Sequence, residues 1–400
     1  MKSLIILLDG FNPEDINEIN TPYVFSFKNN HNSSVLIKSS PFCERSEFYS
    51  GENAAVTNNY FAFDYSPENS NYKGIEKRVY FKIYKNIDLL IDKLALLNFK
   101  LDFLNKIKRR FRSFFLRRTI KNKGNYYSIN QIPYKLLSRF VLTEDSCPPK
   151  EKFSKFKKAF YNQINIKDKK ILNLFDDLCV YQDKLNYYER LDILKKELVN
   201  NAHDIYLIAN SELDFYMHNN GIDKDECFVK RIRNIDTIVK QLTSSFLEMN
   251  PEGKIFLFSP HGMLNVDKKV DVEKAIKKAI CISKNSYFID STAFRVWGED
   301  LIQVWSYLSQ DQDIISNGRL VWSSDFYKKR KEPKHIIWFA NTGTICFPDF
   351  FRRTLAPKGM HGYLDLRTQD GFIITNGDLD KEEFMMSEVS TIINNNLIKK

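Results

Sequence analysis

The sequence opens with Ser3-Leu4-Ile5-Ile6-Leu7-Leu8-Asp9-Gly10, an apolar run that ends directly in a carboxylate and a glycine. A continuous apolar run of this length is typical of a strand buried on both faces of a parallel sheet. A secretory signal would need a longer apolar core and a cleavage site of small residues. We therefore expect a buried strand here, in a protein that stays in the cytoplasm.

Two later segments have the same texture, and each is followed by polar residues. Residues 204–209 lead into a segment with Asp214, and residues 254–258 lead into His261, with a long helical pattern around 225–248 between them. Apolar strands that alternate with amphipathic helices predict an α/β fold with a mostly parallel central sheet sandwiched by helices. Ligands gather beyond the carboxyl ends of such strands, so the polar strand ends indicate one site at one sheet edge.

The middle of the chain differs from both ends. Residues 73–199 are rich in Lys, Phe, Leu and Tyr at helical spacing. We predict a core formed by residues 1–72 and 200–400, with 73–199 as a mainly helical insert. Because it interrupts the core, the insert is a candidate cap over the site.

Within the insert, residues 103–123 interleave basic residues with Phe, Leu and Ile at spacings of three and four. This pattern predicts an amphipathic helix with a basic face. The helix could pack its Phe face on the core and leave the basic face in solvent, or it could lie on an anionic membrane surface. No nucleic-acid motif accompanies the run, so no specific nucleic-acid partner is expected.

Composition excludes several classes of protein. Four hundred residues with 43% hydrophobic content can bury a large core. No apolar run reaches the ~18 residues of a membrane-spanning helix. Six cysteines without close pairs predict reduced thiols rather than a disulfide framework or a zinc knuckle. The net charge of +10 favours anionic partners.

Residues of the metal-ligand type recur in the second half of the chain. Asp214 and His218 are four residues apart, so a helix or tight turn would place both side chains on one face, where they could bind one cation. A pair of surface neighbours has the same spacing. His261 follows a predicted strand, and His361 lies between glycines in a predicted loop.

In their order along the chain, these segments resemble the alkaline phosphatase superfamily, and within it the type I phosphodiesterase/nucleotide pyrophosphatase branch. The resemblance covers both ends of the chain and skips most of 73–200. The segments that carry it are Asp9-Gly10, Thr21-Pro22, Ser50-Gly51, the stretch Asn58 to Pro67, Asp214 through His218 to Gly221, Ser259-Pro260-His261-Gly262-Met263 and Gly359-Met360-His361-Gly362-Tyr363.

The resemblance implies two metal sites, one built from Asp214, His218 and His361. The other would hold Asp9, His261 and a nucleophile. The family usually binds zinc, and a mixed Asp/His set suits zinc or manganese. The implied reaction is two-metal hydrolysis of a phosphate mono- or diester through a covalent intermediate. A phosphorylated small molecule, a nucleotide or a glycan-linked phosphate is the implied substrate.

One position departs from the family pattern. Pro260 stands where the family has a metal-binding carboxylate, so one site loses a ligand and a negative charge. Weaker metal binding there, or a substitute ligand such as Asp267, is expected. The departure also keeps other interpretations open: a degenerate member that binds an anionic ligand, or a sulfatase or phosphotransferase on the same scaffold.

The nucleophile is expected at a helix start near residues 40–46, and the sequence leaves its identity open. Ser40 precedes Pro41, the pattern of an N-cap followed by proline at the first helical position. Cys43 lies in a Phe-Cys-x-x-Ser segment that is loosely similar to the sulfatase nucleophile pattern, and thiolates bind zinc readily. Ser46, or the absence of a nucleophile, is the remaining alternative.

Two further residues match groups that would contact the phosphate. Asn59, or its neighbour Asn58, matches the family's amide donor to a phosphoryl oxygen, and a turn asparagine is the alternative interpretation. Arg45 could pair with phosphate oxygens, or it could be a surface charge on the helix.

Overall fold

The computed structural model describes residues 1–42, 44–70, 72–74, 83, 86, 87, 89, 90, 132–142, 150, 153–175, 186–281, 284–327, 334–352 and 355–398. The chain divides into two compact units. Unit 1 comprises Met1–Tyr60, Cys147–Asn265 and Pro357–Lys400, and unit 2 comprises Phe61–Ser146 and Val266–Ala356. The basic segment 103–123 lies outside the described residues.

Unit 1 is built on a seven-stranded sheet in which most neighbouring strands are parallel, as the sequence predicted. The first strand, β1, is buried along its whole length and pairs in parallel with β6 on one side and β7 on the other. Only β16 runs antiparallel to its neighbours. The strand order is β17 (Glu383–Met385), β2 (Asn32–Ile37), β16 (Gly371–Thr375), β7 (Lys254–Ser259), β1 (Ser3–Leu8), β6 (Ile205–Asn210) and β5 (Ile171–Leu174).

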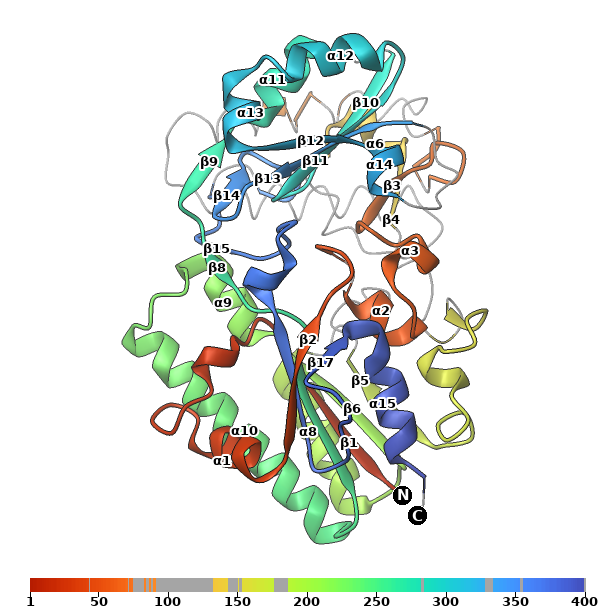
Figure 1. Ribbon diagram of the computed structural model, residues 1–400, viewed down its shortest axis with the longest axis vertical. Helices are drawn as coiled ribbons and strands as arrows, with labels where there is room; N and C mark the ends of the chain where they lie inside the picture. Colours follow the sequence, from red (N-terminus) through yellow and green to blue (C-terminus); the bar gives the residue numbers. More distant parts are fainter. Residues whose placement is uncertain are drawn as a thin grey trace. The chain divides into compact units, whose positions relative to one another are not determined.

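Helices cover both faces of this sheet, which explains why β1 carries no polar face. Leu4, Ile6 and Leu8 face one apolar core, whereas Ile5 and Leu7 face the other. Figure 1 shows α1 and α10 on one side of the sheet and α15 on the other. The longer helices of this unit are α1 (Pro22–Asn30), α2 (Glu44–Ser50), α8 (Tyr187–Asn200), α9 (Glu212–Asn220), α10 (Glu226–Met249) and α15 (Val389–Asn396).

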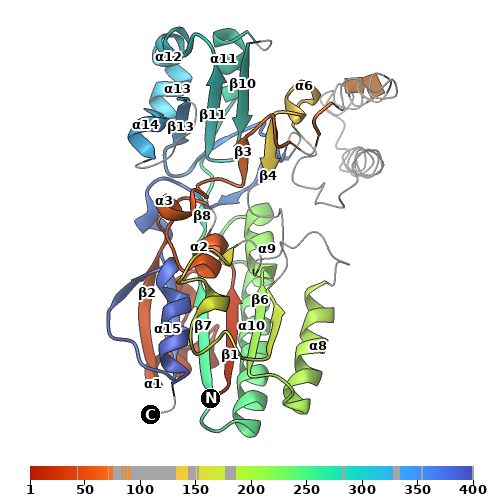
Figure 2. The ribbon, with the colours of Figure 1, turned by 90° about the vertical axis from the view of Figure 1, so that its right-hand side faces the viewer.

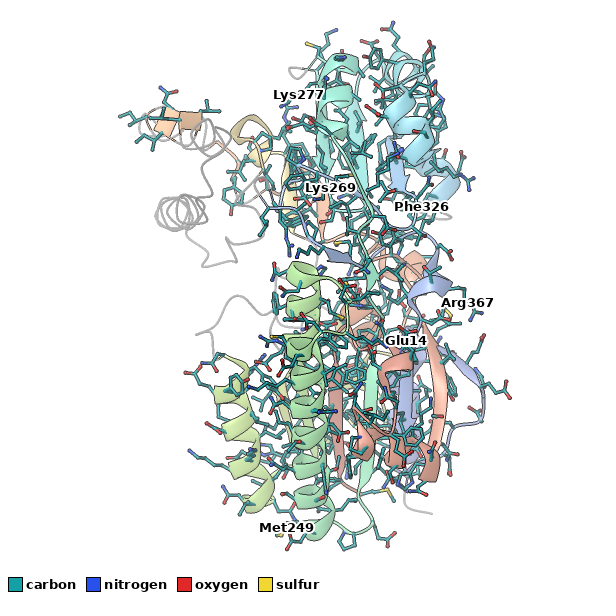
Figure 3. All side chains as sticks on the ribbon, turned by 90° about the vertical axis from the view of Figure 1, so that its left-hand side faces the viewer. Glu14, Met249, Lys269, Lys277, Phe326 and Arg367 are labelled. Carbon is teal, nitrogen blue, oxygen red and sulfur yellow. The ribbon has the colours of Figure 1, made fainter. Side chains whose placement is uncertain are left out.

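The helix predicted around 225–248 is α10. The Asp225 side chain caps it by accepting a hydrogen bond from the backbone N–H of Phe228, a typical N-cap arrangement. Its last residue, Met249, lies at the exposed end of the helix (Figure 3). No helix in the described part of the chain is long and apolar enough to cross a membrane.

Unit 2 contains an antiparallel four-stranded sheet with helices packed on it (Figure 2). A separate pair joins β3 (Phe63–Tyr65) to β4 (Phe140–Leu142). The sheet order is β10 (Asn285–Ile289), β11 (Ala293–Gly298), β13 (Ile336–Ala340) and β12 (Gly318–Trp322), and the longer helices are α11 (Val272–Ala279), α12 (Leu301–Leu308) and α13 (Gln312–Asn317).

Short elements complete the described chain. In unit 1, α3 (Ala54–Thr57) follows α2, and β15 (Gly359–Met360) pairs with β8 (Leu264–Asn265). In unit 2, β14 (Thr344–Cys346) pairs with β9 (Lys268–Val270). The remaining helical turns are α6 (Tyr134–Leu137), α14 (Ser323–Phe326), η1 (Pro13–Asp15), η3 (Phe160–Asn162), η4 (Leu366–Gln369) and η5 (Met386–Glu388).

These units differ from the predicted division into a core of 1–72 and 200–400 with an insert at 73–199. Residues 266–356 form their own antiparallel sheet, although their alternating strands and helices resemble a continuation of the core. Conversely, β5 and α8 belong to unit 1, because β5 pairs with β6 and α8 packs on the same apolar core. The unit to which a segment belongs is therefore set by the strands with which it pairs and not by its position in the sequence.

Candidate metal centre

Three parallel strands of unit 1 end at one edge of the sheet, and each continues into a candidate ligand. Asp9 follows β1, Asp214 lies in α9 after β6, and His261 follows β7. The register pairs Leu8 with Asn210 and Leu7 with Phe258, so the three strand ends are level. In Figure 1, α9 and α2 lie at the same end of this sheet.

A glycine allows the segment after β1 to approach α9 closely. Gly10 has a φ of +72°, and a Cβ added to it would lie 3.0 Å from the Cα of Asp214. Only glycine adopts this left-handed conformation without a steric cost, and here it also leaves no side chain between Asp9 and Asp214. The Asp9-Gly10 sequence therefore combines a possible metal ligand with the glycine that the close approach to α9 requires.

The first cluster lies on α9 and the loop after β15. The side chains of Asp214 and His218 are one turn apart, with His218 Nε2 3.5 Å from Asp214 Oδ2. His218 Nδ1 is 2.9 Å from the carbonyl oxygen of Gly359, which fixes Nδ1 as the donor and leaves the lone pair of Nε2 toward the aspartate. His361 Nε2 lies 3.7 Å from Asp214 Oδ1. One donor atom from each of these three side chains lies within 4.8 Å of the others.

A second cluster lies beside the first and is centred on His261. Its Nε2 is 3.2 Å from Asp9 Oδ1 and 3.1 Å from Glu44 Oε1. The rings of His261 and His361 stack with centroids 3.8 Å apart. Two more triads have donor atoms within 4.8 Å: Asp9, Asp214 and His261, and Glu44, His261 and His361. The clusters thus share Asp214 and His361.

Glu44 is the member that sequence reasoning missed. It is the first residue of α2, in a segment where the sequence predicts a nucleophile and a phosphate-pairing arginine. The signal that could have revealed it was the missing acid at Pro260 together with an acid in the nucleophile segment. Asp267, the substitute suggested from sequence, belongs to unit 2 and is absent from the ligand triads found among the described residues.

The charges around His261 explain how this buried cluster is balanced. Burial alone would lower the pKa of His261, but its hydrogen bonds with Asp9 and Glu44 raise the pKa to about 9. Burial would raise the pKa of Glu44, but the charge of Lys38 and the hydrogen bond with His261 hold it well below its usual range. For Asp9, His261 and Arg45 likewise overcome burial and lower the pKa. A positive group thus stands between two carboxylates.

At the first cluster, by contrast, burial determines the direction of both pKa shifts. Burial, and then the charges of His261 and His218, lower the pKa of His361 well below its ordinary value. Burial raises the pKa of Asp214, and the charge of His218 offsets this only in part. Neutral imidazole is the form of histidine that binds metal ions.

Two buried polar atoms in the first cluster have no hydrogen-bond partner: Asp214 Oδ1 and His361 Nδ1. Leaving a buried polar atom unsatisfied costs about 1–3 kcal/mol, and such exceptions call for an explanation. Both atoms belong to side chains whose donor atoms converge, and histidine with carboxylate is a set that zinc and manganese accept. The residues present therefore fit divalent cations.

The candidate phosphate and nucleophile residues have the following places. Arg45 donates from Nη2 to Asp9 Oδ2 at 3.2 Å and from Nη1 to the carbonyl of Phe175 at 3.0 Å. Ser40 is fully buried and donates its hydroxyl to the carbonyl of Tyr60. Arg45 is therefore fastened to the centre, whereas the Ser40 hydroxyl is committed elsewhere.

The amide of Asn59 donates from Nδ2 to Ser46 Oγ at 3.1 Å, which brings two further candidate residues into contact. Ser46 is buried in α2. Cys43 lies outside the described residues and directly precedes α2 in the sequence. The identity of the nucleophile stays a prediction.

Comparison with known proteins agrees with the motifs. The family model described as type I phosphodiesterase / nucleotide pyrophosphatase matches residues 140–332. A search of curated proteins gave no significant match. Similar solved structures include an inactive variant of murine ectonucleotide pyrophosphatase/phosphodiesterase 5 in complex with AMP, at 13% identity and a TM-score of 0.58, covering 99% of this chain and 95% of that one.

The human ectonucleotide pyrophosphatase/phosphodiesterase 5 is similar at 13% identity and a TM-score of 0.57, over 99% of this chain and 95% of that one. At such low identity the structures show the fold, whereas the family model and the ordered motifs carry the closer likeness. These findings agree with the resemblance that the motifs carry: residues 140–332 are similar to the type I phosphodiesterase / nucleotide pyrophosphatase family, and the fold is similar to that of the ectonucleotide pyrophosphatase/phosphodiesterases.

Proposed function

We propose that this protein is a metal-dependent hydrolase that uses two divalent cations to cleave a phosphate mono- or diester. The observation that carries the proposal is the convergence of donor atoms from three strand ends into two adjoining, buried clusters. Asp214 Oδ1 and His361 Nδ1 are buried without a hydrogen-bond partner, which is costly unless a bound group compensates for it. The match to the phosphodiesterase family model supports the same reaction class.

Asp214, His218 and His361 would hold one cation, and Asp9 and His261 would hold the other. Zinc is the favoured ion and manganese the alternative, given the mixed nitrogen and oxygen donors. When bound, such a pair supplies Lewis-acid stabilisation of the phosphoryl oxygens as charge develops on them. The Gly359 carbonyl contributes by fixing the His218 tautomer, so that its Nε2 is the available donor.

The chain's own residues then have distinct tasks. Arg45, held by Asp9 and the Phe175 carbonyl, places a guanidinium beside the centre, where it can pair with phosphate oxygens. A nucleophile from the 40–46 segment would form a bond to phosphorus while the ester P–O bond breaks and the alcohol leaves. Water would then cleave the covalent intermediate. Cys43 is the favoured nucleophile, because the hydroxyls of Ser40 and Ser46 already have protein partners.

A nucleotide or another phosphorylated small molecule is the proposed substrate class. The complex of the murine relative with AMP supports a nucleotide, and a glycan-linked phosphate has the same reacting group.

The test combines metal content with turnover. Wild-type protein, dialysed against zinc or manganese, should hold two ions per chain and hydrolyse bis-p-nitrophenyl phosphate or p-nitrophenyl phosphate. His361→Ala should lose metal and turnover together, whereas His31→Ala, at an exposed histidine after α1, should change neither. Protein with no bound metal and no turnover would identify a degenerate, anion-binding relative. Preferential cleavage of p-nitrophenyl sulfate would instead identify a sulfatase.

A further inference from the structure

Pro260 removes a carboxylate from the cluster around His261, and the structure contains another carboxylate at that cluster. We infer that Glu44 takes over as the acidic ligand that position 260 lacks, so that the second cation is held by Asp9, Glu44 and His261. This inference rests on the proposed two-metal function and assigns a role to a residue on a different element of the fold.

Geometry provides the first argument. The Oε1 atom of Glu44 and the Oδ1 atom of Asp9 lie 3.1 Å and 3.2 Å from the same atom, Nε2 of His261. Two carboxylates directed at one imidazole nitrogen surround the place where a cation would bind that nitrogen. Carboxylate oxygens and imidazole nitrogens are ordinary zinc ligands. Glu44 therefore approaches the nitrogen from α2, whereas Pro260 sits on the strand end that carries His261.

Charge gives the second argument. A divalent cation in a buried site needs anionic ligands to offset the loss of its hydration. With Pro260 in place of an acid, Asp9 and His261 alone would offer one negative charge. Glu44 restores the second charge, and its side chain is only 14% exposed. Lys38, which is buried and donates to the carbonyl of Pro41, adds a positive charge beside Glu44.

The place of Glu44 in the chain has a consequence for the site. It is the first residue of α2 and lies within the 40–46 nucleophile segment, and Arg45 beside it binds Asp9. A cation bound by Glu44 would tie α2 directly to the ends of β1 and β7. The same ligand that replaces the missing acid would then position the residues around it.

The alternative is that Glu44 serves only as an ion-pair partner of His261. Zinc binding distinguishes these roles, because an ion pair does not coordinate metal. Zinc stoichiometry and affinity are measured by equilibrium dialysis against zinc buffers, followed by elemental analysis, on wild-type protein and Glu44→Gln. The matched control is Glu226→Gln, since Glu226 is also the first residue of a helix but is exposed.

Glu44→Gln should retain one zinc ion and bind the second roughly 100-fold or more weakly, because loss of even an outer-shell partner costs ~10–100-fold. Glu226→Gln should bind both ions as the wild type does. Adding the missing acid in Glu44→Gln/Pro260→Asp should recover much of the lost affinity. The inference is overturned if Glu44→Gln binds two zinc ions with unchanged affinity. A wild type without metal would instead refute the proposed function itself.

Pro260→Asp in an otherwise wild-type chain gives an independent test that does not depend on how Glu44→Gln folds. If Glu44 already fills the ligand position, the added acid should leave zinc affinity nearly unchanged. If the position lacks a ligand, the added acid should strengthen binding of the second ion by about 10–100-fold, and the inference fails.

Discussion

Both units bury a cluster of ionisable side chains, but different groups lie at the centre of the two clusters. In unit 2, the Arg295 guanidinium is buried, donates to the carbonyl of Phe63 and lies 4.0 Å from the ring centroid of Phe61. Its Nη1 is 3.5 Å from Asp64 Oδ1 and its Nη2 is 3.8 Å from Asp290 Oδ2. A protein cation already occupies the centre of this cluster.

At the centre of the unit 1 cluster lie atoms that could bind a metal ion, whereas the guanidinium of Arg295 lies at the centre of the unit 2 cluster. Asp214, His218, His261 and His361 bring possible metal-ligand atoms close together, and among the described residues it is the charges of His218 and His261 that partly offset the burial of Asp214. All three ligand triads found among the described residues lie in unit 1. Burial of acids and unsatisfied polar atoms are therefore common to both clusters, and the convergence of His and carboxylate atoms that could hold a metal ion distinguishes the cluster of unit 1 among the described residues.

The largest expected effect comes from removing Asp214, the acid shared by two of the three triads of unit 1. Asp214→Asn should reduce hydrolysis of bis-p-nitrophenyl phosphate by about 10³-fold or more, because metal-ion stabilisation of the phosphoryl group is worth several kcal/mol. Asp290→Asn in unit 2 is the matched control and should keep turnover near the wild-type value. Comparable losses in both variants would show that the two clusters do not differ in role.

The next effect concerns stability rather than turnover. Arg295→Met should lower the free energy of unfolding by about 3–5 kcal/mol, because Asp290 and Asp64 lose the cation that balances their buried charge. Urea unfolding followed by tryptophan fluorescence measures this change, and Trp297 in β11 lies within unit 2. Zinc content per folded chain should stay that of the wild type. A stability change below about 1 kcal/mol would mean that Arg295 does not balance the charge of the buried carboxylates.

A third test uses pH. Burial, offset only in part by Arg295, raises the pKa of Asp290 to about 7, above the ~3.9 of an unfolded aspartate. Between these values the native state holds a proton that the unfolded state releases, so stability falls as pH rises. From pH 5 to pH 7 this group should cost the wild type about 2 kcal/mol of unfolding free energy.

Asp290→Asn cannot ionise and should lack this part of the pH dependence. Asp349, whose pKa is raised to about 6 by burial despite hydrogen bonds from Arg352 and Ser291, titrates in both proteins, and its charge is one of the causes that raise the pKa of Asp290. Parallel stability curves for wild type and variant between pH 5 and pH 7 would contradict the raised pKa of Asp290.

The comparison of the two units also shows which features of the fold and the site could be predicted from the sequence. The buried strand 4–8 and the alternating strands and helices are local patterns that predict the α/β fold, and the His and Asp motifs are local patterns that predict the ligands at its sheet edge. Glu44 could not be found this way, because its importance depends on a three-dimensional approach to His261 from another element. The boundary at 266 was missed because strands 285–340 pair with one another and not with the central sheet, and pairing is a long-range property.

The smallest expected effect compares two glycines that share a backbone conformation. Gly10 in unit 1 has a φ of +72° and Gly74 in unit 2 has a φ of +76°. Alanine at either position should cost about 1 kcal/mol, since a side chain disfavours the left-handed region. A Cβ at Gly74 would meet nothing within 4 Å, whereas one at Gly10 would lie 3.0 Å from the Cα and Cβ of Asp214.

Gly10→Ala should therefore also weaken zinc binding, because Asp214 must shift away from its partners, and Gly74→Ala should leave zinc binding unchanged. Thermal unfolding in the presence of a chelator measures the shared backbone cost, and zinc titration measures the part that is specific to Gly10. Equal zinc affinities in the two variants would show that Asp214 tolerates the added methyl group. The close approach of Asp9-Gly10 to α9 would then be a packing feature, without influence on the ligand geometry.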